Sequence, residues 1–181
     1  MFKLKPSKIE GCFELQHNVF EDSRGQFLKL FNKDAFAAHN LDTTLSEEYY
    51  SVSYKNVIRG LHFQIPPMEH VKLVTCVDGN VIDVVVDLRT DSPTYGQYAQ
   101  FELSSNNKNS VYIPKGLAHG FCVQSDRALI LCRTSTVFSP EHDAGINWSS
   151  FGFNWPTSNP ILSERDQNLT TLEDFKSPFK L

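Results

Sequence analysis

Short apolar runs separated by turn residues recur along most of the chain. The predicted strands are Gln26–Phe31, Ile58–Gln64, Val71–Val77, Asn80–Leu88, Tyr98–Leu103, Ser110–Ile113, Gly120–Gln124 and Ala128–Thr136. The breaks between them carry turn chemistry such as Ile-Pro-Pro, Asp-Gly and Pro-Lys-Gly. Regular short strands of this kind favour an all-β sandwich or small barrel. Asp34–His39 predicts one or two helical turns, whereas the chain from Pro156 onward is polar with little periodicity.

Two of the predicted strands carry basic residues at alternating positions. Alternation places His62 and Gln64 on one face of the first strand, which also contains Arg59, and His70 and Lys72 on one face of the next. We expect these strands to pair, which would bring a base, a guanidinium and an ammonium together. Such a cluster can hold an anion and remove a proton from a carbon beside a carbonyl.

The strand that follows Asp-Gly also alternates. Asp83 and Asp87 fall on one face with Arg89, whereas the other face is wholly apolar. This pattern predicts a half-buried strand with a polar side. The alternative is that the polar side lines a cavity.

Composition narrows the class of protein. The 181 residues are 40% hydrophobic and 21% charged, which predicts one globular domain spanning residues 1–181. The formal net charge of -4 argues against a nucleic-acid partner. Neither a signal peptide nor an apolar run of membrane-spanning length is visible. The cysteines show no Cys-x-x-Cys spacing, which indicates reduced thiols in a cytoplasmic protein. They are Cys12, Cys76, Cys122 and Cys132.

A metal site is a candidate because Pro114-Lys-Gly-Leu-Ala-His119 matches the second cupin signature. In metal cupins the first signature supplies a His-x-His pair, but the equivalent segment here is His62-Phe-Gln64. A mononuclear site usually needs three protein ligands, and His62, His70 and His119 are the set that could be assembled. We therefore expect neither a metal nor another cofactor.

Most of the chain, from about Val19 to Asp166, resembles the dTDP-4-dehydrorhamnose 3,5-epimerase family. The matching segments are Asp22-Ser-Arg-Gly-Gln-Phe, Arg59-Gly-Leu-His-Phe-Gln, Lys72-Leu-Val, Asp83-Val-Val-Val-Asp-Leu-Arg, Ser92-Pro-Thr-Tyr-Gly, Leu103-Ser, Ile113-Pro-Lys-Gly-Leu-Ala-His-Gly-Phe and Leu162-Ser-Glu-Arg-Asp. The resemblance implies a cupin jelly roll and a homodimer in which N-terminal strands cross between subunits. It also implies metal-free epimerisation of a nucleotide-linked 4-keto-6-deoxy sugar.

The resemblance implies a role for each catalytic candidate. His62 matches the base that removes the proton alpha to the 4-keto group, and Asp166 matches its carboxylate partner. A carboxylate on the far nitrogen fixes the imidazole tautomer and raises its basicity. Lys72 matches the cation that stabilises the enolate oxygen, where charge develops only during reaction.

Further positions match substrate contacts. Arg59 and His119 match residues that hold the diphosphate and the sugar, since a guanidinium grips phosphate oxygens through parallel hydrogen bonds. Arg24 matches a residue contributed across the dimer, and Phe138 an aromatic ring stacked on the base. The other residues predicted to bind the substrate are Lys29, Glu47, Tyr49, Gln64 and Arg165.

One departure from the family pattern concerns catalysis. The family tyrosine that acts as acid on the face opposite the base is Cys132 here. A thiol with a pKa near 8.5 can replace a phenol as proton donor, but it is shorter. It can equally be a small buried hydrophobe. We favour loss or rerouting of this proton transfer, which predicts inversion at one centre, most simply carbon 3.

Other departures concern the substrate. Glu47-Glu-Tyr49 replaces the family Gln-x-Asn, and Lys29 replaces an acidic residue. A carboxylate accepts hydrogen bonds where a lysine only donates them, so the recognised groups change. The nucleotide (dTDP, GDP or CDP) and the sugar (hexose or heptose) therefore stay open.

The combined features predict an epimerase acting at carbon 3, carbon 5 or both, in deoxysugar or surface polysaccharide biosynthesis. One alternative is a 4-keto-sugar ketoisomerase on the same fold. A second is a sugar-nucleotide-binding cupin that has lost turnover. A metal-dependent cupin oxygenase is the last, weakened by the missing His-x-His pair.

Overall fold

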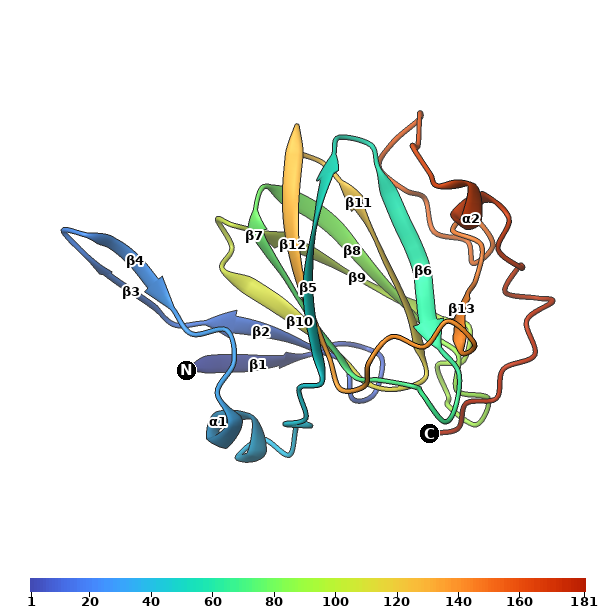
Figure 1. The fold of residues 1–181 in the computed structure, drawn as a ribbon, viewed down its shortest axis with the longest axis horizontal. Coiled ribbons are helices and arrows are strands. Elements are labelled where there is room, and N and C mark those ends of the chain that lie inside the picture. The colour runs from blue at the N-terminus through green and yellow to red at the C-terminus, as the bar shows by residue number, and fades with distance from the viewer.

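The computed structural model describes residues 1–181, which form two antiparallel β-sheets packed face to face (Figure 1). The six-stranded sheet has the order β1 (Phe2–Pro6), β2 (Phe13–His17), β10 (Asn109–Ile113), β7 (Lys72–Asp78), β12 (Arg127–Thr134) and β5 (Glu47–Tyr54). The five-stranded sheet has the order β13 (Asp143–Gly145), β6 (Ile58–Gln64), β11 (Leu117–Val123), β8 (Asn80–Asp87) and β9 (Tyr98–Ser104). The predicted all-β sandwich is confirmed.

One hairpin and two short helices lie outside the two sheets. A hairpin of β3 (Val19–Asp22) and β4 (Gly25–Leu28) projects away from the sandwich (Figure 1). A short helix, α1 (Lys33–Ala37), overlaps the predicted helical turn and places Phe36 in a cluster against the N-terminal strands. A one-turn helix, α2 (Glu164–Gln167), lies in the C-terminal segment. No helix is both long enough and apolar enough to span a membrane.

The interior between the sheets is built by alternation. Val74 and Cys132 of the six-stranded sheet pack against Val81, Val85 and other residues of the five-stranded sheet in one apolar cluster. The neighbours on each strand point to the opposite face, as the two-residue period requires. Burial of this layer stabilises the pairing of strands that are distant in sequence, at about 25 cal/mol per Å² of apolar surface.

The expected pairing of the two basic strands is wrong. β6 pairs with β11 and β13, whereas β7 pairs with β10 and β12 in the other sheet. The connection through Ile-Pro-Pro therefore crosses from one sheet to the other and is not a hairpin turn. As a result, His62 and Lys72 approach each other across the sandwich instead of side by side.

The prediction of a half-buried β8 is also wrong, because both faces are covered. Val84 and Val86 pack outward against Phe151, Trp155 and Phe179 from the C-terminal segment. The polar side is buried as well, with Asp83 and Asp87 inaccessible to solvent. The C-terminal segment, in which the sequence shows little periodicity, thus covers the outer face of the five-stranded sheet. Its large aromatic side chains bury enough apolar surface to hold it there without regular secondary structure.

Candidate active site

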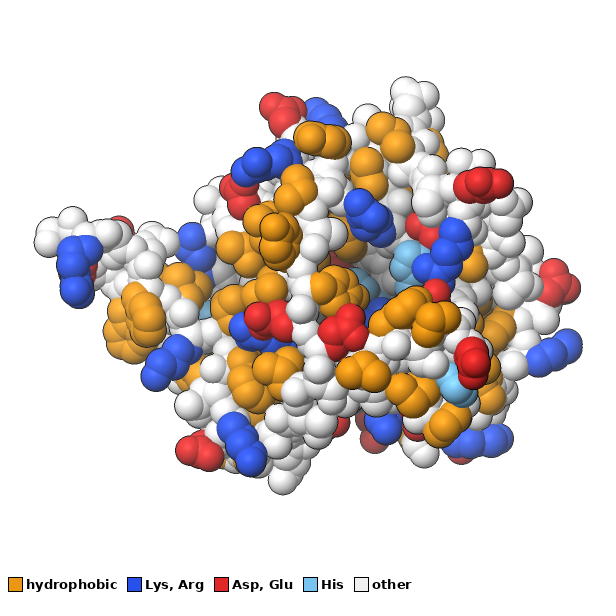
Figure 2. Space-filling view, in the orientation of Figure 1, with side chains coloured by type: hydrophobic (Ala, Val, Ile, Leu, Met, Phe, Trp, Pro, Cys, Tyr) orange, Lys and Arg blue, Asp and Glu red, His pale blue; other side chains and the backbone are white.

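His62 of β6, Lys72 of β7 and Cys132 of β12 all lie between the two sheets, and β5 borders this space beside β6 (Figure 1). The space-filling view shows histidine side chains recessed in a hollow of this region (Figure 2). A cavity of about 190 Å³ opens here. Its lining residues are Glu47, Tyr49, Gln64, His70, Thr134, Thr136 and Phe138.

His62 is held by a carboxylate from a distant part of the chain. Its Nε2 atom lies 2.6 Å from Oδ1 of Asp166. The other oxygen of Asp166 accepts the backbone N–H of Gly60 at 3.2 Å. Asp166 sits in the first turn of α2, where the Ser163 hydroxyl caps the helix by accepting the Asp166 N–H. With Nε2 engaged, Nδ1 is the nitrogen available to take a proton.

The environment keeps His62 neutral. Burial lowers the pKa of His62 below its usual value of 6.5, and the hydrogen bond and charge of Asp166 offset this only in part. Burial raises the pKa of Asp166, but His62, the Gly60 N–H and the Arg165 charge together outweigh this effect, so the pKa lies below its usual value. A neutral imidazole beside a carboxylate can act as a general base at pH 7.

Lys72 reaches the same place from the other sheet. Its Nζ atom donates to the backbone carbonyl of His62 at 3.2 Å. The residue is buried, and this lowers the pKa of its ammonium, while the negative charges of Asp143 and Asp83 act in the opposite direction. A buried donor with one hydrogen bond used has two more to offer a developing oxyanion.

His119 forms a second histidine and carboxylate pair. It lies opposite His62 in the register of β11 and β6, and its Nε2 atom is 2.7 Å from Oδ2 of Asp83. Burial raises the pKa of Asp83, and His119 works against this shift. The sequence placed Asp83 on the polar face of its strand but did not identify it as the partner of His119. Arg59 donates from Nε to the Ser53 hydroxyl at 2.8 Å.

Gln64 and Phe138 are tied to the backbone around the cavity. The Gln64 side-chain nitrogen donates to the carbonyl oxygen of Met68 at 2.8 Å, and its oxygen accepts the Ser139 N–H at 2.6 Å. The Phe138 N–H donates to Glu47 at 2.6 Å, while its ring is exposed at the cavity. Gln64 therefore fixes the loops that form the cavity wall.

Cys132 and Tyr49 are paired across neighbouring strands. The register of β12 and β5 sets them directly opposite each other, with Val74 of β7 on the other side of Cys132. Their side chains lie on the same face of the two strands, and each shifts the pKa of the other. Burial raises the pKa of the Cys132 thiol, whereas the nearby Lys72 charge lowers it.

The remaining predicted residues lie farther out. Arg24 is at the tip of the β3–β4 hairpin, where it pairs with Asp22 and leaves 88% of its side chain exposed. Lys29 borders a separate hollow at the base of this hairpin. Arg165 in α2 forms an ion pair of 2.7 Å with Asp143 of β13. Within one chain, the structure therefore does not bring Arg24 and Lys29 to His62.

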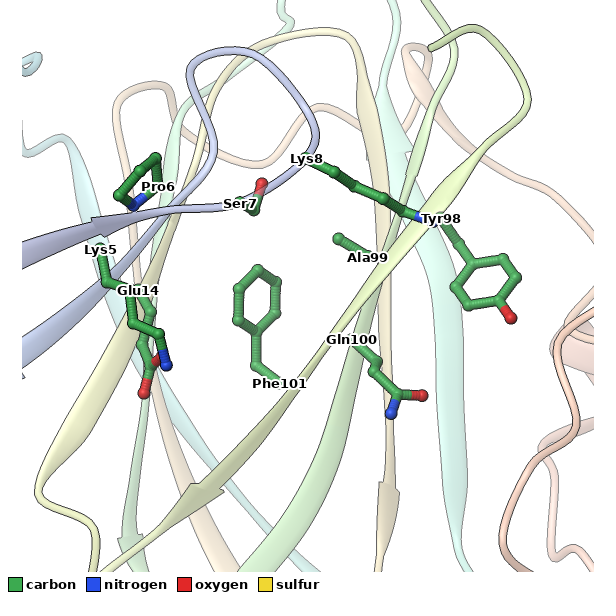
Figure 3. A pocket seen from close by; sticks show the side chains of 9 residues that line it. All are labelled: Lys5, Pro6, Ser7, Lys8, Glu14, Tyr98, Ala99, Gln100 and Phe101. Carbon is green, nitrogen blue, oxygen red and sulfur yellow. The ribbon is translucent and has the colours of Figure 1, made fainter.

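Another hollow, of about 300 Å³, lies between the β1–β2 hairpin and β9 (Figure 3). Lys5 is paired there with Glu14 at 3.2 Å, and Lys8 extends over the ring of Tyr98 at 4.9 Å from its centroid. The lining contains no histidine, and its one carboxylate is paired with a lysine. This hollow therefore lacks a base for proton abstraction.

No group of three or more histidine, cysteine, aspartate or glutamate side chains is arranged to hold a metal ion. The charged and titratable groups that meet at His62 are the Asp166 carboxylate and the Lys72 ammonium.

The family model described as dTDP-4-dehydrorhamnose 3,5-epimerase matches residues 6–174. This chain belongs to that family. The dTDP-4-dehydrorhamnose 3,5-epimerase of Shigella flexneri is 44% identical over 165 residues, which cover 90% of this chain and 91% of that one. The dTDP-4-dehydrorhamnose 3-epimerase of Streptomyces niveus is 39% identical over 175 residues, covering 95% and 84%.

A solved structure supports the same assignment. It is that of dTDP-6-deoxy-D-glucose-3,5-epimerase from Legionella pneumophila in complex with dTDP-4-keto-L-rhamnose, and it superimposes with a TM-score of 0.95 at 29% identity. The two chains cover each other completely. The predicted family, the cupin fold and the enzyme class, a sugar-nucleotide isomerase, are confirmed.

Proposed function

We propose that this epimerase acts on a dTDP-linked 4-keto-6-deoxy sugar with His62 as base, Asp166 as its partner and Lys72 as the enolate-stabilising cation. The observation that carries the proposal is the His62–Asp166 pair with the Lys72 ammonium at the His62 carbonyl. Abstraction of a proton from a carbon beside a carbonyl requires a base for the proton and, close to it, a cation for the enolate oxygen.

The reaction follows from this geometry. Nδ1 of His62 removes the proton from the carbon next to the 4-keto group, and the electron pair moves to the carbonyl oxygen. Lys72 donates a hydrogen bond to that oxygen, where charge is larger in the transition state than in the ketone. A proton returned to the opposite face of the carbon completes the inversion. The imidazolium then loses its proton to solvent.

The choice of dTDP is supported by the names of the relatives, which include a 3,5-epimerase and a 3-epimerase of dTDP-4-dehydrorhamnose. Arg59 and His119 are the proposed contacts to diphosphate and sugar within the chain. Glu47 and Lys29 differ from the family pattern, so GDP- and CDP-linked sugars belong in the same panel of substrates.

We propose further that the working unit is a homodimer located in the cytoplasm, with one cupin domain in each chain. The projecting β3–β4 hairpin supports the dimer, because it carries Arg24 away from its own site. Exposed Phe20 and Phe27 on the same hairpin also favour a partner surface. The four cysteines are free, as expected where thiols stay reduced.

The test is proton exchange in heavy water with dTDP-4-keto-6-deoxyglucose, followed by NMR, alongside its GDP- and CDP-linked analogues. Deuterium should enter carbon 3, carbon 5 or both, and the sugar should be inverted there. His62→Asn should reduce exchange about a hundredfold to ten-thousandfold while nucleotide binding persists. His39→Asn, an exposed histidine beyond α1, is the matched control. Movement of the carbonyl without inversion would identify a ketoisomerase instead.

A further inference from the structure

We propose that Tyr49 is the proton donor on the face of the sugar opposite His62. The proposal rests on the proposed epimerase function and names the second half of its chemistry. Inversion needs a donor on the other side of the carbon from the base, because a base that returns its own proton restores the original configuration. The donor must therefore be on the wall that faces β6.

The residues on that wall are set by the register of β7, β12 and β5. Lys72, Thr134 and Glu47 form one row across these strands, and Val74, Cys132 and Tyr49 form the next. Alternation directs both rows toward the interior of the sandwich. Proton donors or acids in these rows are Lys72, Cys132, Glu47 and Tyr49.

Three of these groups are poorly suited to the step. Lys72 donates one hydrogen bond to the His62 carbonyl and is assigned above to the enolate oxygen, so it is not the donor to carbon. The Glu47 carboxylate accepts the Phe138 N–H, and a carboxylate that accepts hydrogen bonds is not a proton donor. Cys132 lies on β12, one strand farther from the sheet edge than Tyr49, and only 4% of its surface is accessible.

Tyr49 has both access and reach. It lines the cavity, and 45% of its surface is exposed. It is the cross-strand partner of Cys132 on the same inward face, so its longer side chain extends from the position next to the one where the family has its tyrosine. Burial raises the pKa of Tyr49, and the neighbouring Cys132 and Glu47 add to this effect. The hydroxyl thus keeps its proton at neutral pH.

Tyr49 gives its hydroxyl proton to the carbon of the enolate while the electron pair returns from oxygen to form the new C–H bond. The phenolate left behind is hydrogen-bonded by the Cys132 thiol and regains a proton from solvent. Cys132 is then a positioning residue for the Tyr49 hydroxyl. The proton donor thus lies on β5, at Tyr49, instead of on β12, where the family has its tyrosine.

The test compares the Tyr49→Phe variant with the unsubstituted (parent) protein, using dTDP-4-keto-6-deoxyglucose in heavy water. In the variant, His62 still removes the proton and returns deuterium to the same face. We expect deuterium in the uninverted sugar at near the parental rate, with inverted product reduced at least about a hundredfold. Tyr50→Phe is the matched control, because Tyr50 lies on the outer face of β5 and is 67% exposed. Thermal unfolding checks that each variant is folded.

Several outcomes would overturn the proposal. Parental inversion by Tyr49→Phe would do so, and so would equal loss of exchange and inversion, which would indicate a binding role. Loss of inversion in Cys132→Ala with retention in Tyr49→Phe would make the thiol the donor. A parent that exchanges no proton with any 4-keto sugar would refute the proposed function itself, and Tyr49 with it.

Discussion

Nε2 of His62 lies 2.6 Å from Oδ1 of Asp166, a residue 104 positions later in the chain. The pair joins a central strand to a helix of a single turn in the C-terminal segment. Such a short helix is held by its cap and by tertiary contacts rather than by its own hydrogen bonds. The position of the proposed base therefore depends on the docking of that segment on the five-stranded sheet.

Replacing Asp166 by Asn should slow deuterium exchange by about a hundredfold or more, because the imidazole loses the charge that stabilises its protonated form. The amide keeps the size of the carboxyl, so unfolding temperature should change little. Asp174→Asn, at an exposed carboxyl of the same segment, is the control. Parental exchange in Asp166→Asn would show that the pair is structural only.

The pH dependence of kcat/KM should show one acidic limb below pH 6.5. Burial lowers the pKa of His62, and the base works only when neutral, so activity is retained until the pH falls through this lowered value. Asp166 acts to raise the pKa of His62, so Asp166→Asn should move the limb to still lower pH. Rates measured from pH 4.5 to 8 test both statements, and a limb above pH 7 would contradict the first.

Lys72→Met should reduce exchange about a hundredfold to a thousandfold through loss of enolate stabilisation. The same change removes a buried charge and keeps side-chain length, so the free energy of unfolding should stay level or increase. Chemical denaturation and exchange rates are measured together, with exposed Lys55→Met as control. An exchange rate within threefold of the parent would exclude Lys72 from the reaction.

Dialysis against a strong chelator should leave activity unchanged. His62 and His119 each direct Nε2 to a carboxylate, Asp166 and Asp83 respectively, and the site has no third ligand arranged with them. Elemental analysis of the purified protein accompanies the assay. One tightly bound iron or zinc per chain, lost together with activity, would overturn the assignment of roles.

Light scattering at micromolar concentration should show a homodimer. Phe20 and Phe27 are 64% and 59% exposed on the projecting hairpin, so Phe20→Ser should weaken the dimer and reduce activity together. Arg24→Ala should reduce activity while leaving the dimer intact, because Arg24 is predicted to act in the partner's site. A fully active monomer would refute the shared site.

Several features could be predicted from the sequence because they depend on local pattern. Strand β6 is found at its predicted ends, Ile58 and Gln64, since an apolar run between turn residues leaves few alternatives. The pairing of His62 with Asp166 followed from motif resemblance. Strands β1 and β5 were missed, because edge strands with polar or exposed residues carry little apolar alternation.

The family and the all-β class could be read from the sequence, as could the residues proposed as base, carboxylate and cation, since each lies in a contiguous motif. The tertiary structure alone decided that β6 and β7 belong to different sheets, so that Lys72 meets His62 across the sandwich. It also decided that Tyr49 lies against Cys132. These relationships depend on which distant strands pair, and that choice is made by burial of the whole core rather than by any local run of residues.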